Sequence, residues 1–120
     1  MGLKIDVNEK AINDRLAKHM KSLLTTDTML QIADVFAKMC DPYVPFLEGP
    51  LSQTVEVHPT YLHYVQPYAS YQYYGTHFNH TLDYHPKATA HWDKVMMQEK
   101  GDEFFKQVQQ ILLEKDKNNG

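Results

Sequence analysis

The chain begins with the spacing of a strand and then changes to the spacing of a helix. Apolar and polar residues alternate over 3–7, which is the period of a short half-buried strand. Helical spacing follows and ends near Leu24. Asp6 or Asn8 is expected to cap this helix, since residues 6 and 9 have capping-box spacing. The apolar stripe of the predicted helix consists of Ile12, Leu16, Met20 and Leu23.

A second amphipathic helix is predicted after a break at residues 25–27. Thr25, Thr26 and Asp27 are residue types that favour a helix N-cap. The helix is expected to stop at Asp41, because the following Pro42 disfavours helical backbone in the residue before it. The stripe that would face the core consists of Met29, Ile32, Ala33, Phe36, Ala37 and Cys40.

Two β-favouring segments follow a loop rich in proline and glycine that extends to Pro50. Residues 54–57 alternate between polar and apolar, and residues 61–65 are rich in aromatic residues. His58, Pro59 and Thr60 form a turn between them. The pattern therefore predicts an antiparallel hairpin.

The remaining third of the chain is predicted to be helical at both ends. Pro67 is suited to the first turn of a short helix, and Gly75 to its left-handed stop. Residues 76–85 are polar and rich in histidine, which predicts an exposed loop. Pro86 is expected to open a final helical region that Gly101 kinks or divides. Its apolar residues are Trp92, Val95 and Met96, followed by Phe104, Phe105, Val108, Ile111 and Leu112.

These elements predict an α+β fold with two N-terminal helices, a small antiparallel β-sheet and a C-terminal helix. The chain has 120 residues, 42% of them hydrophobic and 22% charged, which fits one globular domain with its own core. We expect the domain to span residues 1–114 and residues 115–120 to form a flexible tail.

Composition excludes several classes of protein. The net charge of −3 provides no basic surface for tight binding to the DNA backbone, although a mildly acidic wall would let DNA slide past. The single cysteine excludes an intramolecular disulfide framework and fits a reducing compartment. No apolar run has the length of a signal peptide core or a membrane span, so we expect a soluble cytosolic product.

Nucleophilic catalysis has little support in the sequence. Cys40 lies on the apolar stripe of the second helix beside Phe36 and Ala37, where burial makes a thiol unreactive. Neither Ser52 nor Ser70 lies in a Gly-x-Ser-x-Gly context, and the chain has no glycine-rich phosphate loop. We therefore predict a protein that is not an enzyme and has no cofactor.

Histidines are the candidates for metal binding. His77, His80, His85 and His91 lie close together in the sequence, and imidazole is a common zinc ligand. Structural zinc sites show tight pairs at defined spacings, whereas only His77 and His80 form a loose pair here. A polar loop explains the cluster better. A small metal-binding protein or enzyme that uses these histidines remains the alternative function.

A dense block of tyrosines is the most distinctive feature of the chain. A domain of this size cannot easily bury all of them together with Trp92 and five phenylalanines, so part of the block is expected at an interface. A tyrosine-rich core is the other interpretation. Stacking on single-stranded nucleic acid is disfavoured, because no Lys or Arg occurs between Val55 and Tyr84. The block consists of Tyr61, Tyr64, Tyr68, Tyr71, Tyr73 and Tyr74.

Three stretches of the chain resemble the small minor capsid protein family of siphophages and prophages of Gram-positive bacteria. The first is the opening strand, residues 1–7, and the second is the turn that begins at Pro42 and continues through Gly49, Leu51, Ser52 and Thr54. The third runs from Pro67 to Gly75 and is followed by His91, Trp92 and a terminal helix. Ser52 and Ser70 stand where the family usually has arginine, so no ion pair is carried over to these positions.

The resemblance implies a structural subunit of the phage neck, which joins the DNA-filled head to the tail, in a tail-completion role. It implies a homo-oligomeric ring, with six copies favoured, beside a stopper or connector and a tail terminator or tail tube. Passive proximity to double-stranded DNA is expected, and no membrane contact. The interface and core residues implied are Tyr68, Tyr71, Tyr73, Tyr74 and Trp92, and the structural turn residues are Pro67, Gly49 and Gly75.

Overall fold

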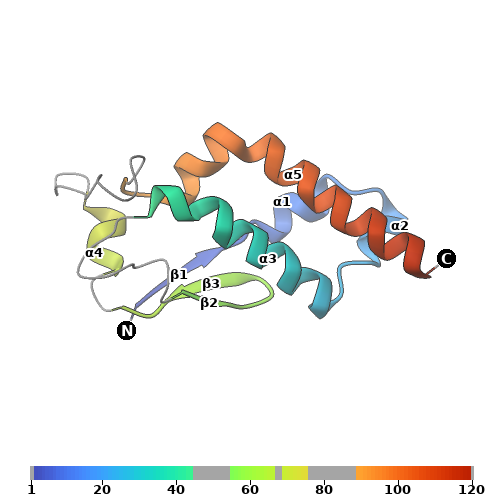
Figure 1. Ribbon diagram of the computed structural model, residues 1–120, viewed down its shortest axis with the longest axis horizontal. Helices are drawn as coiled ribbons and strands as arrows, with labels where there is room; N and C mark the ends of the chain where they lie inside the picture. The colour runs from blue at the N-terminus through green and yellow to red at the C-terminus, as the bar shows by residue number, and fades with distance from the viewer. Residues whose placement is uncertain (1, 45–54, 67–68, 76–88, 120) are drawn as a thin grey trace.

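The computed structural model describes residues 2–44, 55–66, 69–75 and 89–119. The molecule is elongated, with principal extents of 49 × 27 × 21 Å. A small antiparallel sheet lies against helix α3 (Thr26–Cys40), and the long helix α5 (Trp92–Asn119) packs on α3 (Figure 1). This arrangement confirms the predicted α+β class.

The sheet has three strands, β1 (Leu3–Asp6), β2 (Val55–Val57) and β3 (Tyr61–Tyr64), in the order β1-β3-β2. The predicted hairpin is confirmed: β2 and β3 are antiparallel, with Glu56 opposite His63. The first strand also pairs antiparallel with β3, which places Lys4 opposite His63 on the other side. One face of the sheet is therefore buried against the helices, because strand side chains alternate. The buried residues of this face are Leu3, Ile5, Leu62 and Tyr64.

The first predicted helix is interrupted. It forms two short helices, α1 (Glu9–Asp14) and α2 (Lys18–Lys21), separated by an extended Ala17. Helices this short gain their stability from tertiary packing. The bend lets Ile12 and Met20 line one groove beside α5, where the guanidinium of Arg15 lies 3.9 Å from the centroid of the Phe105 ring. Asn8, one of the two predicted caps, is the N-cap of α1; its backbone is left-handed and its side chain makes no capping hydrogen bond.

The second predicted helix is confirmed as α3. Thr25 is its N-cap, and the Thr28 backbone N–H donates to the Thr25 hydroxyl oxygen over 3.3 Å. The helix ends at Cys40 and continues as a short 3-10 turn, η1 (Asp41–Tyr43). The whole predicted stripe is buried, since α3 contacts both the sheet and α5.

The last two helices are α4 (Ala69–Tyr74) and α5. Pro86, the predicted start of the final helix, lies outside the described residues, and α5 begins at Trp92 because His91 has left-handed backbone with φ 48°. The predicted break near Gly101 is confirmed by the non-helical backbone of Lys100. Helical structure extends through Asn119, so the part of the predicted tail that precedes Gly120 is helical. Its flexibility stays a prediction.

The backbone of Gly2 lies close to strand β3, so a substitution at this position tests that contact. Its φ is +151°, and a Cβ there would lie 2.5 Å from the carbonyl oxygen of Tyr64. We expect Gly2→Ala to lower the free energy of unfolding by about 1–3 kcal/mol, measured by urea denaturation. Gly101→Ala is the matched control, because its Cβ would meet only the Met97 side chain at 3.6 Å. Equal stability of the Gly2 variant and the wild type would contradict this close contact.

Candidate functional site

The tyrosines of α4 divide between the core and the surface. Tyr73 is buried, with 6% of its surface exposed, whereas Tyr71 and Tyr74 are 68% and 63% exposed. Tyr71 and Tyr74 are three residues apart and therefore neighbours on the helix surface. By spacing alone, a helix that starts at Pro67 places Tyr71 on the same face as Tyr68, which lies outside the described residues. The structure instead presents Tyr71 together with Tyr74 to solvent.

Tyr73 ties α4 to the beginning of α5. Its ring packs edge-on against the ring of Trp92, with 5.0 Å between centroids and an interplanar angle of 90°. Its hydroxyl donates to Oδ1 of Asp93 over 2.5 Å, and the backbone N–H of His91 donates to its carbonyl oxygen over 2.9 Å. One side chain and one backbone group therefore hold the short helix in place.

Trp92 joins this helix to the sheet. It has no exposed surface, and the Tyr64 ring of strand β3 also meets it edge-on, at 5.3 Å. A second connection runs from Ser70, whose hydroxyl donates to the carbonyl oxygen of Gly2 over 3.2 Å. Ser70 thus contacts the residue that directly precedes the first strand. The described part of the aromatic block consists of two buried tyrosines, Tyr64 and Tyr73, the half-buried Tyr61, and the exposed Tyr71 and Tyr74.

Several predicted site residues lie outside the described residues, namely Gly49, Pro67, Tyr68, His77, His80 and His85. Gly75 directly follows the last residue of α4, and its N–H donates to the carbonyl oxygen of Tyr71 over 2.8 Å. The left-handed backbone expected there stays a prediction. The ring of His91 meets the rings of both Tyr73 and Tyr74 edge-on, with centroid distances of 4.8 and 5.7 Å. His91 therefore forms an aromatic cluster with Tyr73 and Tyr74.

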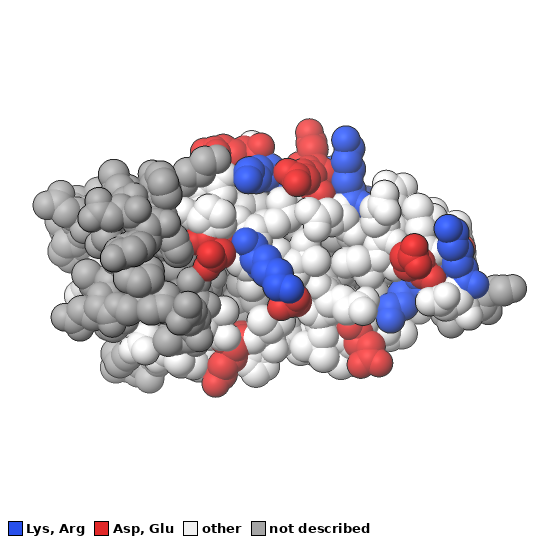
Figure 2. All heavy atoms as spheres, viewed as in Figure 1, with Lys and Arg blue, Asp and Glu red and all other residues white. Residues whose placement is uncertain are grey.

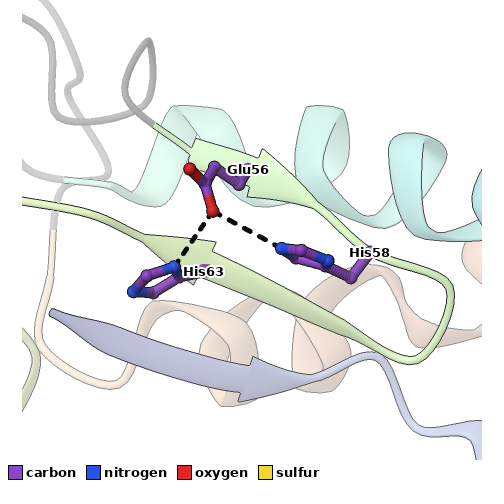
Figure 3. Close-up of side chains that lie close together, drawn as sticks. All are labelled: Glu56, His58 and His63. Atoms are coloured by element: carbon purple, nitrogen blue, oxygen red, sulfur yellow. Dashed lines mark hydrogen bonds and ion pairs between the residues drawn. The ribbon is translucent and has the colours of Figure 1, made fainter.

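A second cluster consists of Glu56, His58 and His63 and lies on the outer face of the hairpin (Figure 3). It was not predicted from the sequence. Oε1 of Glu56 lies 3.1 Å from Nδ1 of His63 and 3.5 Å from Nε2 of His58. Hydrogen bonding to His63 and then to His58 lowers the pKa of the Glu56 carboxyl. The predicted hairpin contained a signal for this cluster. Residues 56 and 58 share one face of a strand, and residue 63 lies opposite residue 56. The candidate metal ligands predicted from the sequence were all histidines after residue 76.

Comparison with known proteins connects these features to a family. A family model described as "Minor capsid protein" matches residues 3–111. The chain belongs to the minor capsid protein family. It is accordingly a structural component of a phage virion, as the three quoted stretches led us to expect. No match was found among curated proteins or among solved structures.

The match to the minor capsid protein family includes both clusters, since α4, the hairpin and the first part of α5 all lie within residues 3–111. Within the described residues, no helix is both long enough and apolar enough to cross a membrane.

The buried polar groups of this minor capsid protein have pKa values that keep them neutral. Burial, followed by the hydrogen bond to Asp93, raises the pKa of Tyr73. Burial and then the hydrogen bond to Glu99 raise the pKa of Tyr43 to about 12. Burial also raises the pKa of Cys40, which has no exposed surface, so the prediction of a core thiol is confirmed. The two tyrosine hydroxyls donate their hydrogen bonds in uncharged form, and the uncharged Cys40 thiol packs in the core.

Charged side chains on the face shown in Figure 2 are mixed in sign. Acidic and basic groups alternate over the described part of this face, and neither sign gathers into a patch. Along helix α3, the ammonium group of Lys38 pairs with the carboxylate of Asp34 at 2.8 Å. Such a surface gives no strong field toward a polyanion.

Proposed function

We propose that this minor capsid protein is a subunit of the neck, which joins the DNA-filled head to the tail of a tailed phage. The pair of exposed tyrosines, Tyr71 and Tyr74, carries the proposal. They are held on a short helix at one end of an elongated subunit (Figure 1). A ring requires each subunit to present a preformed surface to the next copy, and a head-to-tail contact that closes by rotation forms such a ring.

The surface of α4 has the chemistry of a subunit contact. Tyrosine combines a large apolar ring with a hydroxyl that can hydrogen-bond across an interface. Because Tyr73 fixes the helix to Trp92 and Asp93, its exposed neighbours need little further ordering when a partner binds. The occupant that we propose for this surface is a second copy of the chain, in a ring of six.

The charge of the chain is compatible with a position beside DNA. The net charge is −3, and the charges on the face in Figure 2 are interspersed. A ring with this charge would repel the DNA backbone weakly and would let genomic DNA pass. Contacts with DNA are therefore passive in this proposal, and catalysis has no part in it.

The neighbours that we propose are a stopper or connector on the head side and a tail terminator or tail tube on the tail side. The role is tail completion, in a siphophage or prophage of a Gram-positive bacterium. The subunit would be made in the host cytoplasm and would enter the virion during assembly. Support for the family comes from the match over residues 3–111, and support for the ring contact comes from α4.

Localisation in the particle tests the proposal. A cryo-EM map of virions that carry this chain should show it as a ring at the junction of head and tail, with sixfold symmetry. Depleting the chain during infection should leave filled heads and complete tails that stay separate. Density spread over the shell, or normal yields of joined particles after depletion, would contradict the neck role.

A further inference from the structure

Three potential metal ligands converge on the outer face of the β2–β3 hairpin. Glu56 and His63 are directly opposite each other in the ladder, and His58 follows Glu56 by two residues, so all three belong to the same face. Figure 3 shows both imidazoles turned toward the same oxygen of the carboxylate. Their side chains are 57%, 37% and 27% exposed for Glu56, His58 and His63, so an ion can reach them from solvent.

The distances fit one small tetrahedral ion. Zinc lies about 2.0–2.2 Å from nitrogen and oxygen ligands, which places two ligands of a tetrahedron about 3.4 Å apart. The carboxylate oxygen is 3.1 Å from Nδ1 of His63 and 3.5 Å from Nε2 of His58, and the three ligand atoms offered all lie within 4.8 Å of one another. An ion therefore needs only small side-chain rotations to contact all three.

The hairpin holds these ligands on rigid backbone. The His58 ring stacks on the Tyr61 ring, with centroids 4.4 Å apart and planes 13° apart, and its backbone N–H donates to the Tyr61 carbonyl oxygen. His63 lies in the central strand, hydrogen-bonded on both sides. The neighbouring cation, Lys4, lies over the Tyr61 ring at 5.1 Å. Ligands on paired strands lose little freedom when metal binds.

We propose that Glu56, His58 and His63 form a site for one zinc-type divalent cation. Two imidazoles and a carboxylate suit zinc and related transition metals, whereas magnesium and calcium prefer an all-oxygen set. Three protein ligands leave one tetrahedral position open to water. The site lies on the sheet rather than on α4 and does not depend on the proposed neck function.

Titration of the full chain with zinc chloride near neutral pH, followed by calorimetry, tests the site. We expect one ion per chain and a rise in melting temperature with zinc, since an ion bound only to the folded state stabilises it. Losing a direct ligand should cost at least as much as losing a residue that supports one, so H58Q and H63Q should each weaken binding at least about tenfold. E56Q should weaken it as well, because an amide oxygen is a poorer ligand than a carboxylate.

Two sets of control substitutions make the test specific. H19Q removes an exposed histidine from α2, and the combined variant H77Q/H80Q/H85Q removes the histidines of the predicted loop. Both should bind zinc like the wild type. Circular dichroism without zinc would show whether H63Q folds. H58Q changes a residue at the edge of the turn, so it tests the site independently of H63Q. Absence of zinc binding, binding that survives H58Q and H63Q together, or binding lost only in the triple variant would overturn the proposal.

Discussion

Replacing Tyr71 and Tyr74 together by alanine should abolish the formation of infectious particles while leaving the isolated chain folded. The two side chains are 68% and 63% exposed, so their removal deletes little core. If they are the centre of a subunit contact, each truncation removes a hot spot worth about 2 kcal/mol, or about a thirtyfold weaker contact. A ring repeats this contact between every two neighbouring subunits, so the same binding free energy is lost at each contact.

Complementation gives the measurement. A phage or prophage that lacks the gene is supplied with the variant, and plaques are counted while filled heads and free tails are examined by electron microscopy. The melting temperature of the purified variant should remain within a few degrees of the wild type. Leu113→Ala is the matched control, because it truncates a side chain that is 46% exposed and belongs to the C-terminal part of α5, whose end lies far from α4 (Figure 1). Wild-type titres from the double tyrosine variant would refute the contact.

Trp92→Ala should lower the free energy of unfolding by about 3–5 kcal/mol, the range found when large aromatic residues are truncated in a core. Trp92 has no exposed surface, and its ring contacts the rings of Tyr64 and Tyr73, at 5.3 and 5.0 Å. Its removal leaves a cavity where the sheet, α4 and α5 meet. A typical domain is stable by about 5–15 kcal/mol, so this single change removes a large fraction.

Urea denaturation followed by circular dichroism measures the effect, since the variant lacks the only tryptophan and cannot be followed by its fluorescence. Trp92→Phe should cost less, because a benzene ring fills part of the cavity. Tyr71→Ala should stay within about 0.5 kcal/mol of the wild type, as exposed substitutions usually do. A decrease of less than about 1 kcal/mol in the free energy of unfolding of Trp92→Ala would contradict this prediction. It would mean that the neighbouring side chains fill the cavity without destabilising the protein.

Elements whose signals are local could be predicted from the sequence alone. Helix α3 is specified by its buried stripe from Met29 to Cys40, by the Thr25 cap and by the proline after Asp41. Spacing and capping act within a few residues, so they can be recognised in the sequence. The turn at Pro59 determined the hairpin, and the three quoted stretches identified the family. The excess of tyrosine over what a small core can hold likewise indicated that some would be exposed, and Tyr71 and Tyr74 are.

The tertiary structure set the features that depend on contacts between distant residues. It paired β1 with β3, bent the first helix so that Ile12 and Met20 both line the groove beside α5, and began α5 at Trp92 behind a left-handed His91. It placed Tyr73 inward and Tyr74 outward, because Asp93 and Trp92 come from another helix. The Glu56, His58 and His63 cluster arises only when the strands pair in register. Periodicity along the chain cannot specify partners across it.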